Sequence, residues 1–207
     1  MPLNNINELN AMELDILREI GNIGQGNAAS ALSGMLNEKV NIAVPNIKIL
    51  DFNEVVNFLG GPENIAIGLL VGLSDKINGM MLCIMQEPFV SHIVKAIFGN
   101  DITDLTSLSE MEMSFVTEVG NILSASYVNA ISSMTGLNIQ ISVPQISIDM
   151  VGAILSVPAV EFAQIGDKVL FIDDSFLVGD SEIQSNMILV PELESLSTLF
   201  AGLGVDI

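Results

Sequence analysis

The chain has 207 residues, half of them hydrophobic, so it can bury a sizeable core and is not a disordered tail. Six Lys and Arg residues stand against twenty-five Asp and Glu residues, and the formal net charge is −19. This charge argues against nucleic acid and an anionic membrane surface as partners, since both attract basic proteins, and it favours a partner with a basic rim around its site.

The first half begins with a long predicted helix. Asn10 is a favourable N-cap residue, and Glu13 follows three residues later, which is the spacing of a capping box. Residues 40–50 then alternate between apolar and polar positions, which predicts a strand that Pro45 interrupts as an edge, a bulge or a strand end. The remaining elements predicted in this half are a short helix after Asn53, strands at 64–73 and 78–85, and a helix from Pro88 to Gly99.

The second half repeats this order. Ser109 and Glu112 have the capping-box spacing, and the alternating stretch 137–149 is interrupted by Pro144. We expect the acidic residues of 173–182 to lie in a solvated hairpin. The other predicted elements are a helix within 150–163, strands at 168–178 and 184–190, and a last helix that Pro191 opens.

These two series of elements form an internal repeat. A constant shift of 99 positions places Gly120 on Gly21, and residues 10–50 align with 109–149 without an insertion. We therefore predict an internally duplicated, pseudo-twofold α/β (α+β) fold with a mainly antiparallel sheet and two long helices. A single domain over 1–207 is expected, with repeats at about 10–100 and 109–205.

Several other function classes are excluded by composition. The uncharged stretch 119–148 has too many Asn, Ser and Gln residues for a membrane-spanning helix, and no signal peptide is predicted at the start. Cys83 and His92 are the only residues of their types, which excludes an internal disulfide and argues against a Cys/His metal site or a His-dependent triad. We expect a cytoplasmic protein without membrane insertion and without a cofactor of its own.

A polar stripe runs along the first long helix. At 100° per residue, Glu19 and Asn22 lie within about 40° of Asp15, whereas the neighbouring Ile and Leu residues fall on another arc. Such a stripe is often only a solvated face. However, Asn is unfavourable inside a helix, and a solvated face would more naturally carry Lys, Gln or Glu.

The second long helix carries the same stripe in Ser114, Glu118 and Asn121. Both copies keep the Glu and the Asn while neighbouring residues differ, which favours a function. Gly21 and Gly120 beside the two Asn residues would allow another backbone or a partner to come close. The small residues at 24–30 are predicted to let the two long helices pack closely.

Both copies match one pattern: Asp or Ser, three residues, Glu, two residues, Asn, twenty-two residues, Pro. The matching residues are Asp15, Glu19, Asn22 and Pro45, and then Ser114, Glu118, Asn121 and Pro144. This pattern, over nearly the whole chain, resembles the CheC family of chemotaxis phosphatases, which act on phosphorylated CheY. The resemblance implies that Asn22 and Asn121 orient a water for attack on the aspartyl phosphate of the regulator.

The resemblance implies further roles and partners. Glu19 and Glu118 would pair with the active-site lysine of the regulator, which also supplies the Mg²⁺. Family members also bind the receptor deamidase CheD through the second half, where Asp149 precedes the helix predicted within 150–163. Asp149 is a candidate CheD contact, and stabilisation of the helix start by its carboxylate is an equally weighted explanation.

Two other functions stay open on the sequence. The chain could be a non-catalytic adaptor that docks phosphorylated CheY, CheD or both, because the same helix faces would serve for binding alone. It could also be a structural protein of the related flagellar-switch type, although those tend to lack the Glu and Asn pair or to carry extra domains.

Overall fold

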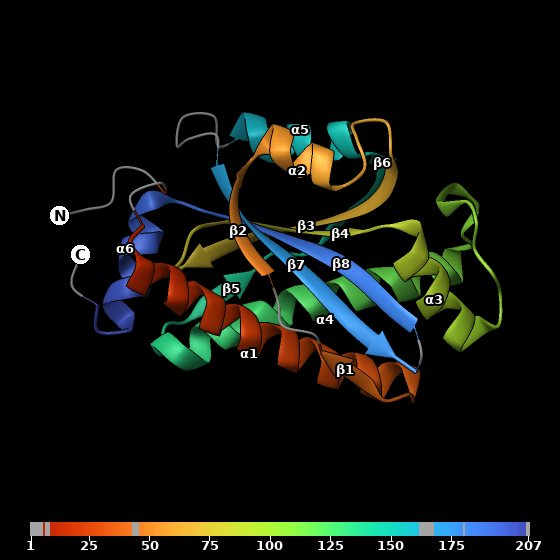
Figure 1. Cartoon of the computed structure of the whole chain (residues 1–207), viewed down its shortest axis with the longest axis horizontal. Coiled ribbons are helices and arrows are strands. Elements are labelled where there is room, and N and C mark those ends of the chain that lie inside the picture. The colour runs from red at the N-terminus through yellow and green to blue at the C-terminus, as the bar shows by residue number, and fades with distance from the viewer. Residues whose placement is uncertain (1–5, 7–8, 43–45, 162–167, 180, 206–207) are drawn as a thin grey trace.

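The structure is a computed structural model that describes residues 6, 9–42, 46–161, 168–179 and 181–205. One curled antiparallel sheet is covered by helices on both faces (Figure 1). The helices are α1 (Ala11–Leu36), α2 (Phe52–Phe58), α3 (Glu87–Phe98), α4 (Glu110–Thr135), α5 (Val151–Glu161) and α6 (Leu193–Gly202). The strands are β1 (Val40–Ile42), β2 (Asn46–Asp51), β3 (Ile65–Asp75), β4 (Gly79–Met85), β5 (Ile139–Ile141), β6 (Gln145–Met150), β7 (Lys168–Val178) and β8 (Ser181–Pro191).

The two halves exchange their edge strands. The sheet order is β1-β7-β8-β4-β3-β5, with β2 also on β7 and β6 also on β3. Thus β1 and β2 of the first half pair with β7 of the second, while β5 and β6 of the second half pair with β3 of the first. Every strand pair in the described ranges is antiparallel. The predicted α+β fold with an internal duplication is confirmed.

Both long helices begin as the sequence predicts. The Asn10 side chain accepts from the N–H of Glu13, whose carboxylate accepts from the Asn10 N–H at 2.6 Å. The same exchange joins Ser109 and Glu112 at the start of α4. Each helix ends at a cap residue in the left-handed conformation, Asn37 after α1 and Gly136 after α4.

Several element boundaries differ from the prediction. Each predicted alternating strand is two strands, β1 with β2 and β5 with β6, and Pro144 precedes β6 at the sheet edge as expected. Pro45 lies outside the described residues. The short helix α2 begins earlier, because Asp51 provides its N-cap. Pro191 is the last residue of β8, in register with Gly79, and Glu192 caps α6 instead.

The sheet separates two hydrophobic layers. The larger layer lies between the sheet and the pair α1 and α4, which run side by side in opposite directions below the sheet in Figure 1. The smaller layer lies beneath α2 and α5 on the other face, where Val55, Leu155 and Phe171 are buried. Within α1, Leu17 and Ile20 are buried as the helical wheel predicts, while Ile16 and Ile23 are only half-buried.

The two long helices pack closely at Gly24. A Cβ atom built on Gly24 would lie 2.5 Å from Cδ1 of Tyr127 in α4, so the helix backbone rests directly on the tyrosine ring. The predicted close packing at the run of small residues is confirmed there. Gly21 and Gly120, by contrast, face inward: they accommodate Ile47 of β2 and Leu69 of β3 rather than a partner. The expectation that they admit another backbone or a partner is therefore wrong, because side chains of the sheet fill the space beside both glycines.

We expect Gly24→Ala to destabilise the fold by about 1–3 kcal/mol, because the added methyl group would push α1 away from Tyr127. Gly26→Ala is the matched control, since a Cβ there meets no atom within 4 Å. The control should be neutral or stabilising by up to about 1 kcal/mol. Urea unfolding of both variants checks this, and equal stabilities would contradict the packing argument.

Candidate functional site

The polar stripe of α1 faces away from the sheet. Asp15, Glu19 and Asn22 are all exposed, on the side of the helix opposite to Leu17 and Ile20. Residues three and four apart stack on one helix face, so the stripe covers about 10 Å of the axis from Asp15 to Asn22. The helix thus presents a carboxylate and an amide together to the outside, as predicted.

The stripe of α4 has the same arrangement with one difference. Ser114 and Glu118 are exposed, whereas Asn121 is half-buried. Neither Asn22 nor Asn121 makes a side-chain hydrogen bond, and neither Glu19 nor Glu118 makes an ion pair, with any residue in the described ranges. Within the part of the chain that the structure describes, the Glu and Asn side chains of both stripes are therefore available to an external partner.

The surroundings of the two stripes are not identical. In α1, the Asp15 carboxylate pairs with Arg18 at 2.6 Å, and both side chains are exposed. Position 117 of α4, which corresponds to Arg18, is a threonine whose hydroxyl donates to the carbonyl of Met113 within the helix. The first stripe therefore carries an extra exposed ion pair that the second lacks.

A buried polar cluster connects both helices to β7. Tyr127 of α4 donates its hydroxyl hydrogen to Asp174 Oδ1 at 2.5 Å, and Asp174 is only 1% exposed. Gln25 of α1 donates from Nε2 to the carbonyl of Ser175 at 3.0 Å. Neighbouring residues of one strand thus hold the middle of α1 and of α4. This fixes how the two stripes are turned outward.

The burial of Asp174 corrects the expected solvated acidic hairpin. Asp174 lies between Ile172 and Phe176 in the alternation of β7, on the side that faces α1 and α4. The alternation of apolar residues around position 174 was a signal available in the sequence. Burial raises its pKa to about 7, although the Tyr127 hydrogen bond acts in the opposite direction. Burial and the nearby Asp174 carboxyl also raise the pKa of Tyr127, so its hydroxyl stays protonated.

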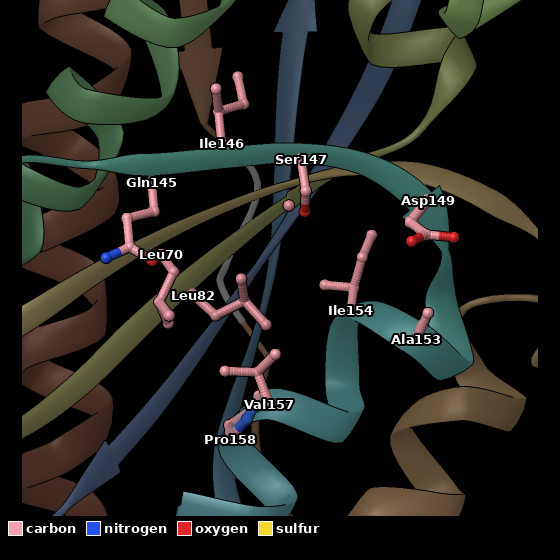
Figure 2. Close-up of a pocket in the computed structure, with 11 residues that line it drawn as sticks. Leu70, Leu82, Gln145, Ile146, Ser147, Asp149, Ala153, Ile154, Val157 and Pro158 are labelled. Carbon is pink, nitrogen blue, oxygen red and sulfur yellow. The ribbon is translucent and has the colours of Figure 1, made fainter.

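Asp149 lies at a groove on the opposite side of the sheet (Figure 2). Gln145, Ser147 and Asp149 point from β6 toward α5, and Ile146 points away, as the alternation predicts. The groove has a volume of about 280 Å³, and Ile154 and Val157 line its α5 side. The Asp149 carboxylate is exposed and accepts from the Met150 N–H just before α5, so it contacts both the groove and the helix start.

The structure therefore divides the predicted site residues between two faces. The stripes of α1 and α4 lie on one face of the sheet, and Asp149 lies on the other. The described residues include no group of three or more His, Cys, Asp or Glu side chains placed to hold a metal ion. Within the same ranges, no helix has the length and apolar character that a membrane crossing requires.

Comparison with known proteins identifies the family. A model of the CheC-like family matches residues 12–49 and 111–148, which include both stripes. The CheY-P phosphatase CheC of Bacillus subtilis is 34% identical over 205 residues, covering 97% of this chain and 98% of that protein. The chain belongs to the CheC-like family. The two separate matches to one model are consistent with the duplication.

Two further relatives of the CheC-like chain connect it to flagellar proteins. The flagellar motor switch phosphatase FliY of Bacillus subtilis is 28% identical over 144 residues, covering 69% of this chain and 37% of that protein. The crystal structure of Thermotoga maritima FliY has a TM-score of 0.74 at 20% identity, covering 95% of this chain and 98% of that one. This structural likeness shows a shared fold.

The buried cluster makes stability depend on pH. The raised pKa of Asp174 means that the native state keeps a proton which the unfolded chain loses from about pH 4 upward. The contribution of Asp174 to the free energy of unfolding therefore decreases as the pH rises toward and through 7, by roughly 2–4 kcal/mol. Asp174→Asn should remove this decrease, because an amide accepts the Tyr127 hydrogen bond without ionising.

Urea unfolding of the wild type and of Asp174→Asn between pH 5.5 and 8 measures this difference directly. The exposed Asp101→Asn is the control, and it should follow the wild-type pH dependence. Parallel curves for the wild type and Asp174→Asn would show that the buried carboxyl does not titrate in this range.

Proposed function

We propose that this chain is a phosphatase that hydrolyses the aspartyl phosphate of a phosphorylated CheY-type response regulator. The proposal rests on the Glu and Asn pair that both long helices present without internal partners, in a chain related to a CheY-P phosphatase. In the proposed reaction a water attacks phosphorus, and the bond from phosphorus to the aspartyl oxygen breaks. The products are inorganic phosphate and the free carboxylate.

Asn22 and Asn121 are the proposed water-positioning residues. An amide donates and accepts hydrogen bonds at once, so one side chain can hold a water in a defined orientation. Acyl phosphates are already activated, and correct placement of the attacking water supplies most of the required rate enhancement. Asn22 is exposed and Asn121 half-buried on these outer helix faces, and we expect either amide to reach the regulator's site, where the regulator would supply the Mg²⁺ beside the phosphoryl group.

Glu19 and Glu118 are the proposed docking residues. Each lies one helical turn before its Asn, so a carboxylate that pairs with a lysine of the regulator would place the amide at a set distance from phosphorus. Such a pair contributes orientation and specificity more than affinity. The charge of −19 would accelerate encounter with a basic surface. We place this reaction in the cytoplasm, where a soluble response regulator would be found.

Removal of both amides tests the proposal. We expect Asn22→Ala with Asn121→Ala to abolish the accelerated release of phosphate from phosphorylated CheY. Folding should survive, because neither amide has an internal partner among the described residues.

The single variants rank the two sites. We expect the larger loss from Asn121→Ala, since the half-buried Asn121 is more restrained and its stripe lacks the Asp15–Arg18 pair.

The controls for this series are circular dichroism of each variant and the exposed change Asn129→Ala, which leaves both stripes intact. Equal losses from the two single variants would contradict the ranking.

A wild type that binds phosphorylated CheY without accelerating its decay, even with CheD added, would support the adaptor function. Self-assembly into large complexes in size exclusion with light scattering would support a switch-type structural role.

We further propose that CheD docks on the groove between β6 and α5. The groove combines apolar walls with one carboxylate at its mouth, and Val157 of its α5 wall is exposed. Burial of such apolar side chains would supply affinity, and Asp149 would set the register. The groove lies across the sheet from both stripes, so CheD and the regulator could bind together.

We expect Asp149→Lys to weaken CheD binding at least tenfold without changing the phosphatase rate measured in the absence of CheD. Glu161→Lys, an exposed charge reversal at the end of α5, is the matched control and should bind CheD normally. Isothermal titration with CheD and a phosphate-release assay measure the two quantities. Unchanged CheD binding by Asp149→Lys would remove this residue from the interface.

A further inference from the structure

Two exposed methionines lie at equivalent places in the two halves. Met12 is 63% exposed in the first turn of α1, and Met111 is 71% exposed in the first turn of α4. They are related by the same shift of 99 positions as the two stripes. Both helices therefore begin with a large apolar side chain that packs against little of its own protein.

Each methionine lies on the same helix face as the stripe that follows it. Met12 precedes Asp15 by three residues and Glu19 by seven, so the three side chains lie in one row along α1. Met111 stands in the same relation to Ser114 and Glu118. Two helical turns, about 10 Å, separate each methionine from the glutamate of its stripe.

The helix starts hold these methionines in place. Glu13, next to Met12, is buried and closes the capping box with Asn10. Glu112, next to Met111, is also buried, and it additionally accepts from Asn100 Nδ2 at 2.8 Å. Because the neighbouring side chain is anchored inward, the first turn is ordered and each methionine is presented outward from a rigid backbone.

Isolated exposed apolar side chains are common and need no function. The chain provides a comparison, since Ile97 of α3 is 44% exposed, whereas Leu203, which lies at the same distance from the N-cap of α6, is half-buried. The two methionines, in contrast, are exposed in both halves and each continues a polar stripe. A solvated first turn would gain more from an acidic residue, which interacts favourably with the helix dipole, than from a thioether.

We propose that Met12 and Met111 are the apolar anchors of two docking faces for the regulator, each inserting into an apolar recess about two helical turns from the regulator lysine. This inference rests on the proposed function. The glutamate and the asparagine select the register, and burial of the methionine side chain slows dissociation of the complex. The unbranched thioether adapts to the shape of a recess, which suits a surface that must bind and release its partner.

The test replaces both methionines with glutamine, Met12→Gln with Met111→Gln, which keeps length and helix propensity while removing the apolar group. Ile97→Gln is the matched control on a surface outside the stripes. The probe is the CheY protein of the same organism, held in its active form by beryllofluoride and Mg²⁺. Titration gives the Kd, and phosphate release from phosphorylated CheY gives KM and kcat.

We expect Kd and KM to rise about tenfold in the double variant, with kcat within about twofold of wild type, because the anchor acts on binding alone. The control should keep all three values. An unchanged Kd in the double variant would overturn the inference, whether or not kcat falls.

The outcomes for this inference and for the phosphatase differ. A wild type that binds active CheY without hydrolysing CheY-P would overturn the phosphatase, while a weaker Kd of the double variant would still support the anchors. A wild type that does not bind active CheY would overturn both.

Discussion

The contact between α1 and α4 at Gly24 and Tyr127 is the constraint on which the rest of this structure depends. The tyrosine ring lies against the α1 backbone, and its hydroxyl binds Asp174 in the sheet. One side chain therefore sets both the distance between the helices and their rotation relative to the strands. Since a rotation of one residue turns a helix face by about 100°, both outward stripes require this inward anchoring.

The duplicated sheet gives the two helices a common support. Each half contributes two edge strands whose partners, in the described ranges, belong to the other half. The edge strands of one half therefore need the other half in order to pair. Burial of Asp174 and Gln25 between the helices and the sheet adds polar contacts whose geometry is specific, at the cost of placing an ionisable group in the core. The two faces of the sheet thus carry separate surfaces, the stripes of α1 and α4 on one side and the groove between β6 and α5 on the other.

The proposed chemistry is compatible with the composition. A reaction on an activated acyl phosphate requires a placed water more than a strong base, so the proposed water-positioning asparagines are compatible with a chain that has a single histidine. Two buried titratable groups, Asp174 and Tyr127, take part in packing and are separate from the stripes on the outer helix faces. The side chains of the stripes can therefore be changed without removing these core contacts.

The sequence by itself determined the duplication, the two capping boxes, the order of elements and the stripes, because each depends on spacing within a short segment. It did not reveal that the edge strands are exchanged, that Gly21 and Gly120 face the sheet, or that Asp174 binds Tyr127. These features join residues up to 150 positions apart, as the hydrogen bond from Gln25 to Ser175 does. Only tertiary packing decides such contacts, since the energy of a buried group depends on which distant residues surround it.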